Sequence, residues 1–285
     1  MTPNPSSAPP SPATVASRAE ELVNLIDSFG PVAVAFSGGV DSAVVAKAAY
    51  LAAPATAIAV TAVSPSLASV ERQTAQQVAQ QIGIRQVELA TQEFARPEYQ
   101  ANPANRCYFC KTELYSVLHS RIGELGVQTI LNGANRDDAG DHRPGMVAAT
   151  EFSVRSPLLE LGFGKTEVRE LAQYWNLTVW DKPASPCLAS RIAYGVPVTL
   201  ERVARIEAAE HYLRETCRLR EFRVRCEAQE LARLELPLSE LGRFVAEETR
   251  QGVVAYLKKL GFRAVTLDLE GFRSGSLNAL VELKI

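Results

Sequence analysis

Apolar residues along the first half of the chain occur in two alternating patterns. Short continuous apolar runs, such as residues 32–36, alternate with segments such as residues 15–26, in which apolar residues recur at helical spacing. The first pattern predicts buried strands and the second predicts amphipathic helices. Further strands are predicted at residues 56–63, 86–89 and 129–131, and further helices at residues 67–82 and 111–122. This alternation indicates an α/β fold, a doubly wound and mostly parallel sheet with helices on both faces.

The pattern changes after residue 195. A charged helix is predicted at residues 200–214, then strands at 222–226, 231–236 and 264–269 and a helix at 239–260. A segment of this size is typical of a small separate domain. We therefore predict three parts: a disordered tail at residues 1–14, an α/β domain at residues 15–195 and a smaller α+β domain at residues 196–285. The tail is rich in Pro and Ser, a composition that cannot form a core.

Composition and charge restrict the class of protein. The 285 residues are 47% hydrophobic and 22% charged, which is ordinary for a globular protein and excludes wholesale disorder. No run approaches the ~20 apolar residues of a membrane span, and the N-terminus lacks the apolar core of a signal peptide. A net charge of -2 provides no field that would attract nucleic acid. We expect a cytoplasmic protein that binds neither a membrane nor nucleic acid.

The hexapeptide SGGVDS, which begins at Ser37, joins a predicted strand to a predicted helix. Gly38 and Gly39 allow an anion to approach the backbone, and the helix that follows presents free N–H groups. Ser37 and Ser42 add hydroxyl groups, and Asp41 can hold Mg²⁺ or cap the helix. The sequence matches neither the P-loop nor the dinucleotide fingerprint. It predicts a site for the phosphates of ATP, with a simple capped glycine turn as the alternative.

Five cysteines without a secretory signal indicate free thiols or metal ligands rather than disulfides. Cys107 and Cys110 form a CxxC pair that can bind one metal or cluster, and Cys187 is the candidate third ligand. Three thiolates leave one position open, either on zinc, with His142 or water as the fourth ligand, or on one iron of a [4Fe–4S] cluster. Buried core thiols are the alternative. The two remaining cysteines are predicted to pack in the second core, and they are Cys217 and Cys226.

Polar residues elsewhere supply groups for a nucleotide or a substrate. Asp137, Asp138 and Asp141 lie in a polar loop after the last strand of the first domain. They can bind Mg²⁺ or a ribose, or they can form a solvated loop without ligands. Arg155 and Lys165 can neutralise the phosphates of ATP or of the substrate.

The residues around Cys187 suggest sulfur chemistry. Ser190 and Arg191 follow it closely, and a guanidinium there would favour both a thiolate and an anionic substrate. In the second domain, Arg223 and Arg225 occupy alternate positions of a predicted strand and therefore share one face. That face either binds a phosphate or forms a solvated edge, and we favour the solvated edge.

The motifs together resemble a known family. SGGVDS is similar to the signature of the PP-loop ATP pyrophosphatases, which adenylylate a substrate oxygen and release pyrophosphate. Beyond the tail, the whole chain resembles one family of this superfamily, the LarE-type pyridinium-3,5-biscarboxylic acid mononucleotide sulfurtransferases. The matching segments are SGGVDS at Ser37, RCYFCK at Arg106, NGANRDDAGDHRPG at Asn132, RSPL at Arg155 and SPCLASRIAYG at Ser185. Together they are specific, whereas SGGVDS alone is not.

The resemblance implies an ATP-dependent sulfurtransferase that converts carboxylates of the pyridinium mononucleotide to thiocarboxylates for the nickel-pincer nucleotide of lactate racemase. Cys187 matches the sulfur-handling cysteine of the family. Members without a CxxC pair sacrifice the sulfur of that cysteine, whereas members with the pair resemble cluster enzymes. Because Cys107 and Cys110 are present here, we expect ATP, Mg²⁺ and a [4Fe–4S] cluster as cofactors. Sulfide or another sulfur donor would be a partner, and the resemblance also implies a homo-oligomer.

Three other classes of protein share part of this pattern. A PP-loop amidotransferase or an NAD-synthetase-like enzyme would use the same ATP site with a nitrogen nucleophile, and it would not need the three cysteines. A tRNA-thiolating enzyme would need a basic tract for its RNA. This chain has no such tract, and its charge is balanced. A non-enzymatic nucleotide-binding module would leave the cysteines without a use.

Overall fold

The computed structural model describes residues 12–138 and 144–273 of the chain. The chain divides into two compact units, each assembled from separate segments of the sequence. Unit 1 consists of Met1–Val63, Ser69–Thr91 and Lys111–Ser185, and unit 2 consists of Ser64–Ala68, Gln92–Cys110 and Pro186–Ile285. This division differs from the predicted one between residues 195 and 196, because three segments before residue 196 pack with unit 2.

Unit 1 contains a four-stranded parallel sheet, as the apolar runs predict. Its strands are β1 (Val32–Ala35), β2 (Ile58–Val63), β3 (Arg85–Ala90) and β4 (Thr129–Leu131), in the order β3-β2-β1-β4. Ala33 of β1 pairs with Ile58 of β2 on one side and with Ile130 of β4 on the other. The predicted α/β class with a parallel sheet is confirmed.

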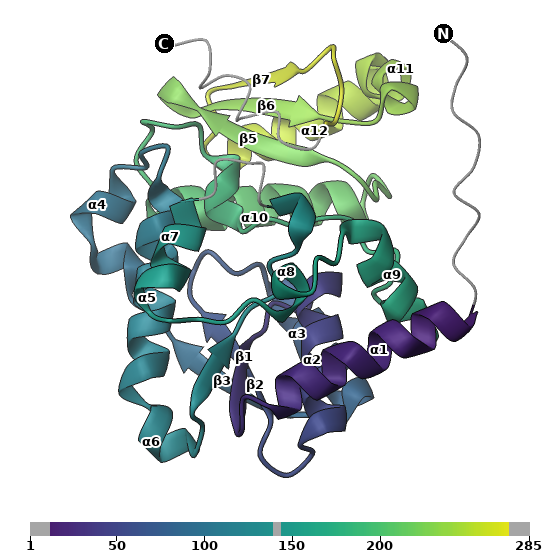
Figure 1. Cartoon of the computed structure of the whole chain (residues 1–285). Helices are drawn as coiled ribbons and strands as arrows, with labels where there is room; N and C mark the ends of the chain where they lie inside the picture. The colour runs from purple at the N-terminus through teal and green to yellow at the C-terminus, as the bar shows by residue number, and fades with distance from the viewer. Residues whose placement is uncertain (1–11, 139–143, 274–285) are drawn as a thin grey trace, which may run out of the picture. The chain divides into compact units, whose positions relative to one another are not determined.

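The direction in which strands are added to this sheet reverses after β3. The helices α2 (Val40–Ala52) and α3 (Ser69–Ile82) add β2 and β3 on one side of β1. The chain returns through α5 (Arg106–Ser120) and α6 (Ile122–Leu125) and places β4 on the other side. Because such crossovers are right-handed, the reversal puts the returning helices on the opposite face, as Figure 1 shows. The carboxyl ends of β1 and β4 flank this reversal, where ligands bind in open α/β sheets.

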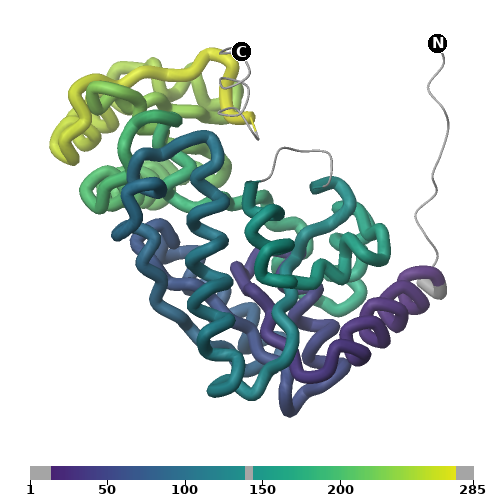
Figure 2. Tube along the Cα trace, turned by 60° about the vertical axis from the view of Figure 1, so that its left-hand side comes forward, coloured from purple at the N-terminus to yellow at the C-terminus, as the bar shows by residue number. Residues whose placement is uncertain are grey.

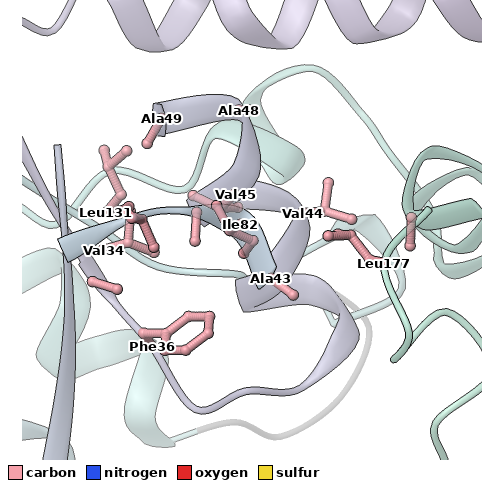
Figure 3. Close-up of a cluster of buried hydrophobic side chains, with 14 of the residues drawn as sticks. Val34, Phe36, Ala43, Val44, Val45, Ala48, Ala49, Ile82, Leu131 and Leu177 are labelled. Atoms are coloured by element: carbon pink, nitrogen blue, oxygen red, sulfur yellow. The ribbon is translucent and has the colours of Figure 1, made fainter. Parts of the chain in front are cut away.

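The core of unit 1 is built around α2. This helix is apolar on most of its surface because it packs against the sheet and against α1 (Pro12–Asp27) and α9 (Lys165–Tyr174). In Figure 3, Val34 of β1 and Leu131 of β4 lie with Val44 of α2 in the buried cluster. Each such side chain contributes about 1.5–3 kcal/mol when fully buried. The core thus fixes the position of α2 and of the turn before it.

Two short helices follow β4 in unit 1, and the apolar pattern did not predict them. They are α7 (Pro144–Glu151) and α8 (Pro157–Glu160), and a single 3-10 turn at Arg136–Asp138 comes before them. A helix of one or two turns gives too few apolar positions for its periodicity to be detected.

Unit 2 contains a three-stranded mixed sheet covered by helices. Its main elements are α10 (Leu200–Glu215), β5 (Arg223–Glu227), β6 (Leu231–Glu235), α12 (Glu247–Lys259) and β7 (Ala264–Leu267), drawn from green to yellow in Figure 2. The strand β6 lies in the middle, antiparallel to β5 and parallel to β7. Its short elements are α4 (Pro97–Gln100), α11 (Leu241–Val245) and 3-10 turns at Glu93–Ala95, Leu188–Arg191, Ala228–Glu230 and Leu238–Glu240. These strands and helices agree with the predicted α+β region.

Two predicted elements differ from the structure. The helix predicted from residue 111 begins at Arg106, so that Cys107 and Cys110 lie in its first turns. The periodicity missed this start because the first residues are basic, aromatic or Cys rather than aliphatic. The helix predicted at residues 239–260 is broken at Ala246, whose ψ of 140° is not helical.

The predicted tail lies mostly outside the described residues, and α1 begins at Pro12. Across residues 12–138 and 144–273, no helix combines the length and the apolar character that a membrane crossing requires.

Candidate active site

The SGGVDS turn lies directly between β1 and α2. Gly39 is the N-cap residue of α2, so the free N–H groups of this 13-residue helix open at the turn. The hydroxyl groups of Ser37 and Ser42 lie 3.2 Å apart, and Ser42 also donates to the carbonyl of Gly39 at 3.0 Å. The turn is therefore held in shape by its own hydroxyl groups.

Glycine is required at two places around this turn. Gly38 has a φ of +71°, and a Cβ atom there would lie 2.7 Å from the Cα of Ala75 on α3. At Gly133, in the loop after β4, a Cβ atom would lie 2.8 Å from the backbone nitrogen of Ser42. Gly39 is different, since its Cβ atom would meet only the Ser37 hydroxyl, at 3.4 Å. The turn is thus packed closely between α3 and the loop after β4.

Asp41 is the centre of a polar cluster at this turn. Its carboxylate pairs with the ammonium of Lys165 at 2.5 Å and accepts a hydrogen bond from Nδ2 of Asn135 at 3.0 Å. Asp137 accepts from the backbone N–H of Lys165 at 2.7 Å, and Asp138 accepts from that of Asn135 at 3.0 Å. The structure therefore brings together the turn, the loop after β4 and the start of α9.

This cluster has the groups that a magnesium nucleotide needs. The helix N-terminus and Lys165 can supply positive charge for phosphates, and Asp41, Asp137 and Asp138 can supply oxygen ligands for Mg²⁺. Sequence reasoning did not single out Asn135, although its place after a strand next to β1 was a usable signal. Asp141 lies outside the described residues.

Arg155 makes its contacts away from the turn. Its guanidinium forms two hydrogen bonds with Glu160, at 2.9 and 2.5 Å, and lies 4.2 Å from the ring centre of Phe29. The hydrogen bonds from Arg155 lower the pKa of Glu160. A role for Arg155 in phosphate binding stays a prediction.

Cys187 is exposed at the start of a 3-10 turn in unit 2. Its carbonyl oxygen accepts hydrogen bonds from the backbone N–H of Ser190 at 3.0 Å, from Oγ of Ser190 at 2.6 Å and from Nη1 of Arg191 at 3.0 Å. Leu188 is buried beside it and donates to the carbonyl of Ser66 at 2.8 Å. The backbone is fixed while the thiol faces outward, which suits a sulfur atom that reacts.

Two buried arginines donate hydrogen bonds to the backbone of the Cys187 turn. Arg191 is 4% exposed, pairs with Glu210 at 3.0 Å and also donates to the carbonyl of Pro186. Arg225 is 6% exposed, pairs with Glu235 at 2.8 Å and donates to the carbonyl of Ser190 at 2.8 Å. Arg191 was expected to act on the thiolate and the substrate, but its charge is largely compensated by Glu210.

The solvated edge predicted for Arg223 and Arg225 is wrong. Arg225 is buried against Glu235, because β5 lies beneath the Cys187 turn rather than at a free surface. Burial, followed by the nearby positive charge of Arg191, lowers the pKa of Arg223 to about 10.

The CxxC segment and the Cys187 turn are joined by two buried residues that the sequence analysis did not single out. Arg106 donates from Nη1 to Oδ1 of Asn102 at 2.6 Å and to the carbonyl of Ala189 at 2.8 Å. Asn102 is fully buried with a φ of +55°, and its Nδ2 donates to the carbonyls of Ala193 and Val196, both at 2.8 Å. Apart from the bond between Arg106 and Asn102, the acceptors are backbone carbonyls, which exist at every residue, so the sequence holds no signal for these contacts.

The thiols share charged and polar neighbours. Burial raises the pKa of Tyr99, and negative charge on Cys187 and Cys110 raises it further. Burial opposes the charge of Arg106, but negative charge on Cys187 and Cys107 outweighs it and raises the pKa of Arg106. All three thiols therefore act electrostatically on one small region of unit 2.

A metal site was predicted at Cys107, Cys110 and Cys187. No group of three or more His, Cys, Asp or Glu side chains within residues 12–138 and 144–273 is placed to hold a metal ion. His142 lies outside these ranges. The donor set itself, three thiols without a carboxylate, is of the kind that iron–sulfur clusters use. The residues fit a cluster by chemistry, and the assignment stays a prediction.

The other two cysteines are structural, as predicted. Cys217 and Cys226 are 7% and 0% exposed and belong to the core of unit 2. Burial, followed by negative charge on Glu230, raises the pKa of Cys226 to about 11. A neutral buried thiol is a poor nucleophile.

Comparison with known proteins identifies one family profile and similar full-length chains. A family profile described as asparagine synthase matches residues 19–103, which include the SGGVDS turn. An uncharacterized protein of Synechocystis sp. is 47% identical over 264 residues, 92% of this chain and 98% of its own length. The pyridinium-3,5-bisthiocarboxylic acid mononucleotide synthase of Lactiplantibacillus plantarum is 38% identical over 268 residues, 93% of this chain and 95% of its own length.

The similarity to the synthase extends over nearly the full length of both chains and includes both units. The structure has the parallel sheet and the turn that the family resemblance implies. The chain therefore belongs to the LarE-type family of ATP-dependent sulfurtransferases, within the PP-loop superfamily.

Proposed function

We propose that this enzyme converts carboxylates of pyridinium-3,5-biscarboxylic acid mononucleotide to thiocarboxylates, a step in the synthesis of the nickel-pincer nucleotide. The observation that carries the proposal is the exposed thiol of Cys187 on a fixed backbone turn, in a chain that also holds an SGGVDS turn at a helix N-terminus. The similarity to the synthase of L. plantarum supports this substrate.

The first step is activation of the carboxylate. A carboxylate oxygen attacks the α-phosphorus of ATP, the bond to the β-phosphate oxygen breaks, and an acyl-adenylate and pyrophosphate form. The N–H groups at the start of α2 and the ammonium of Lys165 neutralise the phosphates, while Asp41, Asp137 and Asp138 hold Mg²⁺. Activation is necessary because oxide is a poor leaving group, whereas AMP is a good one.

The second step is sulfur transfer. A sulfur nucleophile at Cys187 attacks the acyl carbon, the bond to AMP breaks, and the sulfur remains on the substrate as a thiocarboxylate. Ser190 and Arg191 fix the Cys187 backbone, so that the thiol is held ready to react. If the sulfur comes from Cys187 itself, its Cα proton is lost to a base, the Cβ–Sγ bond breaks with its electron pair leaving on sulfur, and dehydroalanine remains.

The CxxC pair favours a route that spares Cys187. We assign Cys107, Cys110 and Cys187 as the ligands of a [4Fe–4S] cluster. Bound there, a cluster supplies an iron without a protein ligand, which can take up inorganic sulfur for delivery. The segments that carry the three thiols are tied together through Arg106 and Asn102 within unit 2. Self-association of the chain stays a prediction.

The test uses the full-length chain, purified without oxygen and reconstituted with iron and sulfide. Thiocarboxylate product, pyrophosphate, iron content and intact mass are measured with ATP, Mg²⁺ and the pyridinium mononucleotide. We expect Cys107→Ala, Cys110→Ala and Cys187→Ala each to lose iron and repeated turnover. Cys226→Ala is the matched control, since it removes a buried thiol of the same unit and should retain both.

The two sulfur routes give different results in this experiment. If Cys187 is sacrificial, Cys107→Ala and Cys110→Ala retain one turnover, and the wild-type protein ends lighter by one H₂S. Pyrophosphate release that does not depend on the pyridinium carboxylate would overturn the proposed function itself, and so would an ATP-dependent amide as the product with ammonia.

A further inference from the structure

Arg106 differs from the other buried arginines beneath the Cys187 turn. It is 3% exposed at the first position of α5. Arg191 and Arg225 each pair with a buried carboxylate, Glu210 and Glu235. Among the described residues, no carboxylate lies within ion-pair distance of Arg106. Its charge is therefore buried without a counter-ion in the described part of the chain, an arrangement that is unfavourable unless an anion compensates it.

Part of the guanidinium is also free to donate. Both of its hydrogen bonds, to Asn102 and to Ala189, leave from Nη1. Over residues 12–138 and 144–273, Nε and Nη2 of Arg106 have no protein acceptor. A guanidinium carries five N–H donors, so these two atoms present three that no described residue uses. A buried and partly unpaired cation of this kind is typical of an anion site.

The position of Arg106 identifies the anion. Arg106 directly precedes Cys107 at the start of α5, and its Nη1 donates to the carbonyl of Ala189 in the 3-10 turn that begins at Cys187. The buried guanidinium therefore lies between the two segments that carry these thiols. Sulfur held by these cysteines is the anion that such a placement favours.

We propose that Arg106 is the counter-ion of an anionic sulfur site formed by Cys107, Cys110 and Cys187, with its free Nε and Nη2 groups as donors to sulfur. The role of this counter-ion rests on the proposed function, in which Arg106 would keep the transferable sulfur anionic. Hydrogen bonds and net charge around such sulfur atoms control their electron density. Arg106 also fixes the Cys187 turn through its hydrogen bond to Ala189, so the test includes a variant that keeps the charge.

The charge of Arg106 can be measured on the metal-free, reduced, full-length chain without ATP or substrate. Cys187 is modified with an anionic and with a cationic methanethiosulfonate of similar size, and site-specific rates are read by mass spectrometry. We expect the anionic-to-cationic rate ratio to fall about fivefold in Arg106→Gln, because a nearby positive charge attracts one reagent and repels the other. Arg106→Lys should stay within about twofold of wild type, since it keeps the charge.

Arg205→Gln is the matched control. Arg205 is also buried in unit 2, at 7% exposure, but it pairs with Glu201 and Glu230. Its removal should leave the ratio unchanged. A second readout is the iron retained after reconstitution, which we expect to fall by more than half in Arg106→Gln and to be largely kept in Arg106→Lys.

The result can overturn the inference independently of the function. An unchanged ratio in folded Arg106→Gln, or an equal fall in Arg205→Gln, would show that Arg106 is not the counter-ion. If Arg106→Gln does not fold, the anionic-to-cationic rate ratio of wild-type Cys187 is compared with the same ratio for the free thiol N-acetylcysteinamide. A ratio for Cys187 that is no higher than the ratio for the free thiol overturns the inference. If the modification rate ratios are as expected but no thiocarboxylate product forms, only the proposed function is overturned.

Discussion

The SGGVDS turn of unit 1 and the Cys187 turn of unit 2 are stabilised in different ways. The first is fixed by its own hydroxyl groups and by close packing of Gly38 on α3, and its ion pair between Asp41 and Lys165 is partly exposed. The second is fixed by buried arginines that donate to its backbone carbonyls. Steric fit thus dominates at one turn, and buried charge and hydrogen bonding dominate at the other.

Because of this difference, we expect the two turns to be sensitive to different kinds of substitution. A turn fixed by steric fit fails when an atom is added, whereas a turn fixed by buried polar groups fails when a partner is removed.

The largest effect is expected from adding one methyl group at Gly38. Gly38→Ala forces an L-residue to a φ of +71° and places Cβ 2.7 Å from Ala75. We expect a loss of about 4 kcal/mol in the free energy of unfolding, from strain and overpacking together, and loss of pyrophosphate release. Gly39→Ala, whose Cβ would contact only the Ser37 hydroxyl at 3.4 Å, should cost under about 1 kcal/mol. Equal losses measured by urea unfolding would contradict the steric argument.

The second effect is removal of the hydrogen-bonding residue in unit 2. Asn102→Ala leaves Arg106 and the carbonyls of Ala193 and Val196 without their partner, and we expect a loss of about 3 kcal/mol. Asn176→Ala is the control, because Asn176 has the same φ of 55° but is exposed. It should cost about 1 kcal/mol. Similar losses in both variants would mean that backbone strain, not hydrogen bonding, accounts for Asn102.

Gly38 and Asn102 illustrate what could and what could not be predicted from the sequence. The parallel sheet and the Gly38 turn were predicted because apolar periodicity and glycine spacing are local in sequence. Asn102 was not predicted, because its acceptors are backbone carbonyls about 90 residues away, at Ala193 and Val196. The start of α5 at Arg106 was missed because its first residues are basic, aromatic or Cys, which gives no aliphatic periodicity.

The third effect is a loss of stability at alkaline pH that originates in unit 2. Burial raises the pKa of Cys226 from 9.0 to about 11. The neutral thiol therefore stabilises the fold fully below pH 9.0, and this contribution is lost as the pH rises to about 11. It amounts to at most about 3 kcal/mol. Cys226→Ala should flatten this part of the curve of unfolding free energy against pH, and a curve as steep as that of wild type would exclude Cys226 as its source.

The smallest effect on stability is expected at the ion pair of unit 1. Lys165→Met removes the partner of Asp41, but the two side chains are 37% and 26% exposed, so the loss should be about 0.5 kcal/mol. ATP affinity should fall about tenfold or more, because a phosphate ligand is lost. The measurements are urea unfolding and the thermal shift with MgATP. A large loss of stability with unchanged ATP affinity would show that Lys165 stabilises the fold and does not bind the phosphates of ATP.

The interleaving of the two units has a consequence for how a newly made chain folds. Asn102 and Val196 lie 94 residues apart in sequence, so the segment with Cys107 and Cys110 leaves the ribosome long before its partners exist. Contacts between such distant segments form late, whereas elements near each other in sequence pair early. The sheet of unit 1 can begin to assemble during synthesis, but the segment with Cys107 and Cys110 reaches its hydrogen-bond partners only after the Cys187 turn has been translated. Folding of unit 2 is therefore completed late in synthesis, whereas folding of unit 1 can begin early.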